Sequence, residues 1–208
     1  MKPTIEKISN KPNFGWRIQY YHSYDSRFDW HYHFEYELVL HRDYKGKKFV
    51  GDYIGPIEHN SLSLYGPKLP HATTFDNCAD NSRNATYIIW FSQAWISQLI
   101  KVLPELKNLQ PMLDKSSQGI EFPEPCAQKI FLLLENYQTL SPALAVSRVI
   151  EVLVTLSEST TVKRLNSYSP KNVEESDNTL KLVEKISLYI ERNYRDNIKL
   201  EDLCRQIH

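Results

Sequence analysis

The chain has 208 residues, a formal net charge of zero at pH 7, 41% hydrophobic residues and 24% charged residues. This composition is typical of a soluble globular protein with one large domain or two small ones, and it carries no strong net field to attract nucleic acid or a membrane surface. No segment is apolar for long enough to span a bilayer, and the first ten residues lack the apolar stretch of a signal peptide.

The cysteines point to the compartment in which the protein works. Cys78, Cys126 and Cys204 are odd in number and far apart, and they match neither a metal-binding spacing nor a disulfide framework. Cysteines used in this way are typical of the reducing cytosol. We therefore predict a cytoplasmic protein with no membrane partner.

Two strands are predicted near the N-terminus. Aromatic and β-branched residues are dense over residues 16–24 and again from Trp30 to Leu40, where no Gly or Pro interrupts the run. Side chains alternate between the two faces of a strand, so one face of the second strand carries four polar residues: His31, His33, Glu35 and Glu37. A surface strand rarely has two His and two Glu in one row, and we interpret this face as the lining of a cavity.

Short apolar stretches separated by turn residues continue as far as residue 91. A hairpin turn is expected at Lys45-Gly46-Lys47, and Gly-containing dipeptides follow at short intervals. Strands are predicted over residues 53–54, 61–65, 71–75 and 87–91. Many short strands at this spacing favour an antiparallel barrel or sandwich.

The hydrophobic period changes to a helical one near Trp95, where Ile96, Leu99, Ile100, Leu103 and Leu106 recur three and four residues apart. A second helix is expected after Pro125. A third is expected to begin with Ser141 as N-cap and Pro142 in its first turn.

The remaining residues read as a linker and a further helical segment. Residues 157–177 are rich in Ser, Thr, Lys and Glu and have few apolar residues, which is typical of a linker. Helical periodicity returns at Leu180, and the chain ends at His208 within an expected helix. Two helices of about 30 residues in total do not bury a core of their own, so we expect the sequence to be truncated.

The combination of these segments resembles the AraC-type transcriptional regulators. The run from Phe28 to Leu38, followed by Gly46, Gly51-Asp52 and the segment from Gly66 to His71, is similar to the sensor cupin of that family. The segment from Leu180 to His208 is similar to the opening of the family's DNA-binding domain. That similarity is carried by Ile186, Tyr189-Ile190, Asn193-Tyr194, Leu200 and Leu203-Cys204. The sequence departs from the family pattern at Lys199 and Cys204, and both recognition helices would lie beyond His208.

The resemblance implies four parts along the chain. A mainly β cupin, an antiparallel barrel or jelly roll, covers residues 1–95, and a helical dimerisation segment covers 96–158. A linker over 159–177 leads to the truncated start of an all-α helix-turn-helix domain over 178–208. The implied function is that of a ligand-responsive regulator: the barrel binds a small-molecule effector, a carbohydrate being one candidate, and controls DNA binding by a homodimer.

The same resemblance identifies candidate site residues. Cupins that bind metals use a His-x-His-x-x-x-Glu set and a distant His, which this chain matches with His31, His33, Glu37 and His71. Such a set suits a divalent metal such as Zn, Fe, Mn or Ni. Alternatively, these side chains bind an organic ligand or one another without a metal. Glu35 shares their face and is expected near the barrel mouth.

Aromatic residues supply the other candidate ligand contacts, and simple barrel packing is the alternative for each. These residues are Tyr20, Trp30, Tyr65 and Trp90.

Two other classes of function are consistent with the sequence. One is a metal-dependent cupin enzyme, an isomerase or oxygenase, that uses the same four residues. The other is an interaction module without DNA binding, in which the chain acts as a dimerising partner. A cupin enzyme has no need of the linker and the helices after it, so we expect a regulator rather than an enzyme.

Overall fold

The computed structural model describes residues 3–8, 15–22, 29–76 and 84–167. The predicted helix-turn-helix start over 178–208, and the predicted linker from residue 168 onward, lie outside these ranges. Among the described residues, no helix is both long and apolar enough to cross a membrane.

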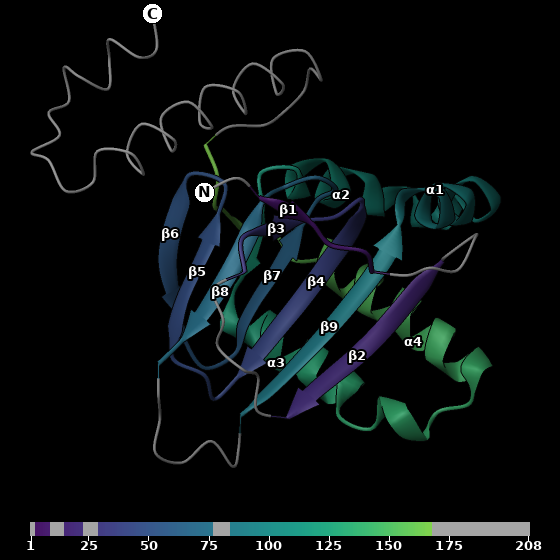
Figure 1. Ribbon diagram of the computed structural model, residues 1–208. Coiled ribbons are helices and arrows are strands. Elements are labelled where there is room, and N and C mark those ends of the chain that lie inside the picture. Colours follow the sequence, from purple (N-terminus) through teal and green to yellow (C-terminus); the bar gives the residue numbers. More distant parts are fainter. Residues whose placement is uncertain (1–2, 9–14, 23–28, 77–83, 168–208) are drawn as a thin grey trace, which may run out of the picture. The chain divides into compact units, whose positions relative to one another are not determined.

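Two β-sheets are formed mostly by the N-terminal strands, and the larger one also includes two short strands from later in the chain (Figure 1). The smaller sheet has the strand order β1 (Thr4–Ile5), β3 (His31–Tyr32), β8 (His71–Phe75), β5 (Gly46–Val50) and β6 (Tyr53–Ile57). The larger sheet has the order β11 (Lys163–Arg164), β10 (Ile120–Phe122), β7 (Ser61–Tyr65), β4 (Glu35–Arg42), β9 (Ala85–Ser92) and β2 (Trp16–His22). The strand pairs other than β1 with β3 are antiparallel, and the predicted mainly β cupin followed by helices is confirmed.

The helical segments follow β9 along the chain. They are α1 (Gln93–Val102), the 3₁₀ turn η1 (Pro104–Leu109), α2 (Gln110–Ser116), α3 (Glu124–Leu134), the 3₁₀ turn η2 (Tyr137–Thr139) and α4 (Pro142–Ser157). Helix α4 begins as predicted, because the hydroxyl of Ser141 accepts a hydrogen bond from the N–H of Leu144 at 3.4 Å and Pro142 occupies the first turn. Figure 1 shows α3 and α4 behind the larger sheet.

The larger sheet separates two cores. In β4, Tyr36, Leu38 and Leu40 belong to the apolar core shared with the helices. Val39 faces the other way, into the core between the sheets. Because side chains alternate along a strand, Glu37 and His41 point to the same side as Val39, into the barrel.

The stretch predicted as one strand from Trp30 to Leu40 is two strands, and this corrects the sequence interpretation. Strand β3 ends at Tyr32 in the smaller sheet, and β4 begins at Glu35 in the larger one. At the crossing between them, the His33 carbonyl accepts a hydrogen bond from the N–H of Lys68 at 2.7 Å. The segment from His31 to Glu37 therefore places side chains in the barrel interior from the smaller sheet at its start and from the larger sheet at its end.

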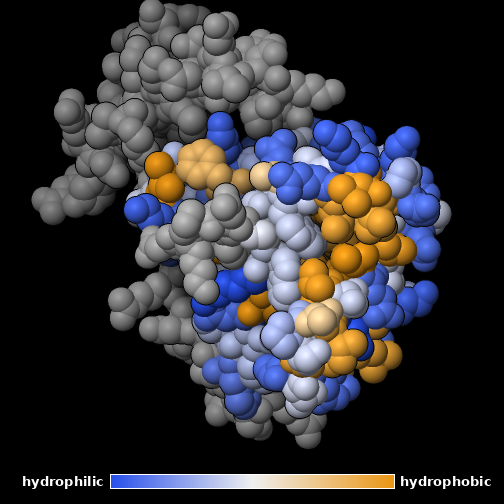
Figure 2. Space-filling model, turned by 90° about the vertical axis from the view of Figure 1, so that its right-hand side faces the viewer, coloured by the Kyte–Doolittle hydropathy of each residue, from blue (hydrophilic) through white to orange (hydrophobic). Residues whose placement is uncertain are grey.

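Apolar residues also gather on the outer surface, on the side of the molecule that carries α1 and α4 (Figure 2). The exposed apolar side chains of the helices include Val102 in α1, Leu132 in α3 and Leu144 in α4, which are 75%, 60% and 57% exposed. Exposed apolar patches often mark sites of interaction.

Candidate metal centre

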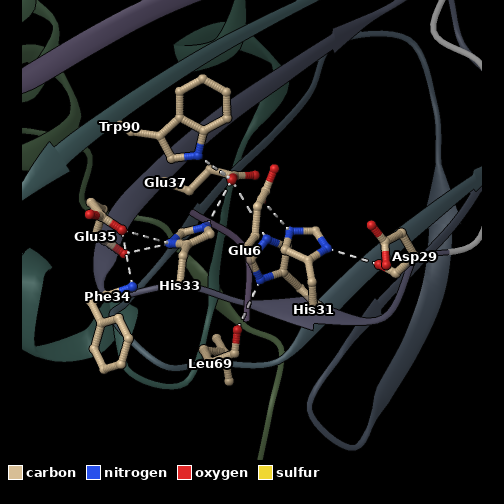
Figure 3. A network of polar contacts seen from close by, with 10 residues as sticks. Glu6, Asp29, His31, His33, Phe34, Glu35, Glu37, Leu69 and Trp90 are labelled. Carbon is tan, nitrogen blue, oxygen red and sulfur yellow. Dashed lines mark hydrogen bonds and ion pairs between the residues drawn. The ribbon is translucent and has the colours of Figure 1, made fainter. Parts of the chain in front are cut away.

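Four side chains meet at one end of the barrel interior (Figure 3). His31, His33, Glu37 and His71 each offer one ligand atom, and these atoms all lie within 4.8 Å of one another. Strand β3 pairs with β8 so that His31 lies opposite His71, while His33 lies in the crossing and Glu37 in β4. The residues predicted as a metal set are thus brought together by both sheets.

Backbone carbonyls fix the orientation of all three imidazole rings. The Nδ1 atom of His31 donates to the Asp29 carbonyl at 2.9 Å, that of His33 to Glu35 at 3.1 Å and that of His71 to Leu69 at 2.9 Å. A carbonyl oxygen can only accept, so each Nδ1 carries a proton and Nε2 is the ring atom that a metal ion would bind, in place of the proton that His31 and His33 share there with Glu6 and Glu37. Metal-binding histidines in proteins are typically oriented in this way.

Glu37 supplies the negative charge of the cluster. Its Oε2 atom accepts a hydrogen bond from Trp90 Nε1 at 2.7 Å, and it lies 3.0 Å from His33 Nε2 and 3.6 Å from His71 Nε2. Burial alone would raise the pKa of Glu37, but the neighbouring His71 ring and the charge and hydrogen bond of His33 outweigh it and hold the pKa well below its usual range. The carboxylate is therefore ionised at neutral pH.

The donor chemistry of the cluster fits a divalent cation. Three imidazole nitrogens and one carboxylate oxygen are ligands that suit Zn, Fe, Mn or Ni. His71 Nε2 is buried and has no hydrogen-bond partner among the described residues, which a bound ion would provide. The role of these residues as metal ligands stays a prediction.

A fifth residue, Glu6, joins the cluster from the N-terminal segment. Its carboxylate lies 3.1 Å from His31 Nε2, and its N–H donates to the Tyr32 carbonyl at 2.9 Å. No sequence pattern singles out Glu6, because its segment is polar and irregular and its partners His31 and Tyr32 lie about 25 residues away along the chain. Glu6 is half-exposed and lies at the edge of the site.

The contact between His31 and Glu6 predicts a pH dependence for the metal-free protein. Burial lowers the pKa of His31, but the hydrogen bonds to Glu6 and Asp29 outweigh it and raise the pKa to about 9 from an ordinary 6.5. A folded-state pKa above the unfolded one stabilises the fold below pH 6.5, and this stabilisation is lost as the pH rises to 9. With chelator present, we expect the thermal unfolding midpoint to decrease as the pH is raised from 6.5 to 9. Glu6→Gln should flatten the profile, and an unchanged slope in that variant would contradict the assignment.

The remaining predicted site residues occupy different positions. Tyr65 and Trp90 line the barrel cavity, and the Tyr65 ring lies 4.6 Å from that of His71. Glu35 begins β4, where its carboxylate accepts from the N–H of Phe34 at 3.0 Å, and it lies outside the cluster of four ligands.

Tyr20 and Trp30 are not among the residues that line this cavity. The Tyr20 ring packs 5.0 Å from that of Tyr87, against the core shared with the helices. Its position in β2, paired with Tyr87 in β9, turns it to the helical side of the sheet. This position gives no support to the ligand contact predicted for Tyr20.

The cavity beside the cluster has a volume of about 50 Å³. Sites for drug-sized molecules are typically about 300–1,000 Å³, and a water molecule takes up about 30 Å³. The space is therefore suited to an ion with one or two small molecules, and a sugar would require the barrel to widen. Glu6, His31, Glu37 and His71 lie around this cavity, and so does His41.

His41 is a candidate residue that the sequence analysis missed. It lies four residues after Glu37 on the same face of β4, so the alternation that selected Glu37 also selects His41. The predicted strand stopped at Leu40, one residue too early to include it.

Trp90 is expected to tune the affinity of the site through Glu37. Trp90→Phe keeps an aromatic ring in the cavity but removes the N–H that donates to the Glu37 carboxylate. Loss of such an outer hydrogen bond typically weakens metal binding by about 10- to 100-fold. Competition against a chromophoric chelator would measure the change, and an unaltered affinity would show that the Trp90 hydrogen bond is not needed.

Comparisons with known proteins give similarity only to solved structures. No family model and no curated protein matches the chain. ToxT from Vibrio cholerae O395, bound to (E)-4-(8-methylnaphthalen-1-yl)but-3-enoic acid, is 14% identical with a TM-score of 0.46, and the match covers 93% of this chain and 71% of ToxT. The AraC-like transcriptional activator CuxR is 10% identical with a TM-score of 0.45, and the match covers 83% of this chain and 56% of CuxR.

A cupin protein is also similar to part of the chain. The cupin 2 conserved barrel domain protein from Salinispora arenicola CNS-205 is 12% identical with a TM-score of 0.33, over 46% of this chain and 79% of that protein.

Proposed function

We propose that this chain is the sensor part of an AraC-type transcriptional regulator whose cupin barrel binds a divalent metal ion through His31, His33, Glu37 and His71. The observation that carries the metal site is the convergence of three Nε2 atoms and one carboxylate while every Nδ1 is already bonded to a carbonyl. With neutral rings, His33 Nε2 and Glu37 Oε2 would be two acceptors facing each other at 3.0 Å. A proton or a metal ion between them removes this repulsion, and a metal ion satisfies His71 as well.

The ion would act by changing the relative stability of two arrangements of the barrel. Its ligands come from β3, the crossing, β4 and β8, so binding links the smaller sheet to the larger one. An effector shifts a conformational equilibrium only by its difference in affinity for the two states. In the proposed mechanism, the state that the ion favours sets the orientation of DNA-binding domains that begin within residues 178–208.

Pairing of two copies and a cytoplasmic location belong to the same proposal. The exposed apolar side chains of α1, α3 and α4 lie in the segment predicted to dimerise, and a homodimer would cover such a surface. Two DNA-binding domains would then reach adjacent half-sites on DNA.

A metal-dependent enzyme is the second candidate function. The specific observation that favours it is the small cavity, which lies directly beside the ligand cluster and has space for a reacting molecule. Turnover of a substrate by metal-loaded protein, lost in a Glu37 variant, would favour the enzyme over the sensor.

The deciding experiment is elemental analysis of protein purified without chelator or affinity metal. We expect one divalent ion per chain, and none in the His31→Ala, His33→Ala double variant. His59→Ala is the matched control, because His59 is an exposed histidine paired with Asp43 at 2.7 Å outside the barrel cavity. Wild-type protein that stays metal-free when dialysed against Zn, Fe, Mn or Ni ions would overturn the proposed site.

A further inference from the structure

The Gly51-Asp52 pair belongs to the pattern that resembles AraC-type sensor cupins, but the proposed metal site does not use it. The pair forms the turn between β5 and β6 in the smaller sheet. The Asp52 carboxylate accepts hydrogen bonds from the backbone N–H of Ser167 at 3.1 Å and from the hydroxyl of the same residue. A Cβ atom on Gly51 would lie 2.5 Å from Nδ2 of Asn166, so the turn requires glycine for this close approach as well as for its φ of +57°.

The same part of the chain is attached to the larger sheet. Residues 163–167, which we call the strap, begin with β11, and β11 pairs with β10. Two more N–H groups of the strap donate to carbonyls that precede β10: Leu165 to Gly119 at 2.9 Å and Asn166 to Gln118 at 2.8 Å. The strap therefore bridges the two sheets, and the rest of the predicted linker follows it along the chain.

Leu165 anchors the strap in the interior of the barrel. Its side chain is 6% exposed and belongs to the core between the two sheets, together with Val50, Tyr65 and Trp90. Tyr65 and Trp90 also line the barrel cavity. Because buried side chains are closely packed, a movement of these aromatic rings changes the packing of Leu165.

Lys163 adds polar contacts to both sheets at the start of the strap. Its Nζ atom donates to the hydroxyl of Tyr53 in β6 at 3.0 Å and lies 3.9 Å from the carboxylate of Glu121 in β10. The Lys163 side chain is 61% exposed, so water screens its charge and the ion pair contributes little. Burial of Leu165 is therefore the larger contribution to the attachment of the strap.

We propose that the strap is a conformational switch: it stays attached while the barrel is packed as in this structure, and it is released when a ligand widens the barrel. The cavity of about 50 Å³ is too small for an organic effector, so such a ligand would displace the rings that pack with Leu165. A ligand that binds only the widened barrel favours the released strap. The effect of release on DNA binding rests on the proposed regulator function, whereas attachment and release are properties of the barrel itself.

Residue-resolved amide hydrogen exchange on the full chain tests the attachment, with chelator present so that no metal ion contributes. The N–H groups of Leu165, Asn166 and Ser167 should be protected in the wild type. Leu165→Ala removes most of the buried side chain and should speed their exchange by at least about tenfold, while exchange in β4 stays as in the wild type. Leu144→Ala is the matched control, because Leu144 is 57% exposed in α4, and it should leave the strap protected.

Asp52→Ala keeps the test decisive if Leu165→Ala folds poorly. It removes the surface carboxylate that binds Ser167 and should speed exchange of the Ser167 N–H by about 2- to 10-fold, the range for loss of one ordinary hydrogen bond. Asp114→Ala is its control, because Asp114 is an exposed aspartate in α2 that accepts a hydrogen bond from Gln110.

Two neighbouring residues of β9 test whether the barrel interior controls the strap. Trp90 belongs to the core that contains Leu165, whereas Phe91 belongs to the core shared with the helices. Trp90→Ala should speed exchange of the strap by at least about tenfold. Phe91→Ala destabilises the whole fold, but release of the strap is a local opening, so strap exchange should stay within about threefold of wild type.

Three results would overturn the inference. They are wild-type strap amides that exchange as fast as an unfolded chain, strap exchange that neither Leu165→Ala nor Asp52→Ala changes, and equal effects of Trp90→Ala and Phe91→Ala on the strap. Failure of the wild type to bind a divalent ion overturns the proposed metal site only, because the exchange measurements are made with chelator.

Discussion

Glu37→Gln is expected to lower the metal affinity of the barrel by more than about 100-fold. Loss of an outer hydrogen-bond partner typically costs 10- to 100-fold, and Glu37 is itself a proposed ligand. It is also the one carboxylate in the cluster of four, and it is buried, so its charge is poorly screened. The amide of Gln would place a neutral group, and in one orientation an N–H donor, against the ion.

Glu35→Gln is the matched control for this variant. Glu35 lies two residues earlier on the same strand. Its partly exposed carboxylate accepts a hydrogen bond from the N–H of Phe34 and lies 3.8 Å from His33 Nδ1, beyond hydrogen-bond distance, and it is not among the four ligands. We expect its affinity, measured by titration against a competing chelator, to stay within about threefold of wild type. Equal affinities for the two variants would rule out Glu37 as a ligand.

The ligand set was predicted from residue identity and spacing, but the geometry that assembles it was not. Residues in an extended strand rise about 3.3 Å each, so His31 and Glu37 would be about 20 Å apart on one straight strand. Their ligand atoms lie within 4.8 Å because the chain crosses from one sheet to the other at His33 and Phe34. No Gly or Pro marks this crossing, so a sequence pattern does not reveal it.

Contacts between distant segments account for most of what the sequence did not show. Glu6 contacts His31 because β1, which ends one residue before Glu6, lies beside β3 in the smaller sheet. Strands β10 and β11 have three and two residues, too few for a periodic pattern, and they lie in segments predicted as helical and linker. Their place in the larger sheet was therefore not predicted.

Sequence signals for a helix end were reliable where the residues involved lie within one helical turn of each other. The predicted start of α4 is correct because capping by Ser141 depends on residues next to it. The predicted first helical face was too long, because the helix ends at Val102 and Pro104 begins a separate 3₁₀ turn.

Gly46 shows how a correct glycine signal can be given the wrong role. It was predicted in a hairpin turn, but it is the first residue of β5. A Cβ atom at this position would lie 2.0 Å from the Thr74 carbonyl oxygen on β8, so the close approach of two strands requires glycine there.

Phe91→Ala is expected to cost about 3–5 kcal/mol of unfolding free energy, the range for removing a buried aromatic side chain. Phe91 is fully buried in β9, where its ring stacks 5.0 Å from Tyr36 and meets the edge of Trp95 in α1 at 6.3 Å. It joins the larger sheet to the helices, so its loss leaves a cavity between the two layers. Urea denaturation followed by circular dichroism would measure the change.

Phe34→Ala is the control for Phe91→Ala, because Phe34 is 52% exposed, and we expect it to cost less than about 1 kcal/mol. Phe91 and Trp90 are neighbours that point to opposite faces of β9, one into the helical core and the other into the metal cavity. Phe91→Ala should therefore lose stability while still binding one metal ion per chain in the absence of urea. A cost as small as that of Phe34→Ala would mean that the helices add little to the stability of the barrel.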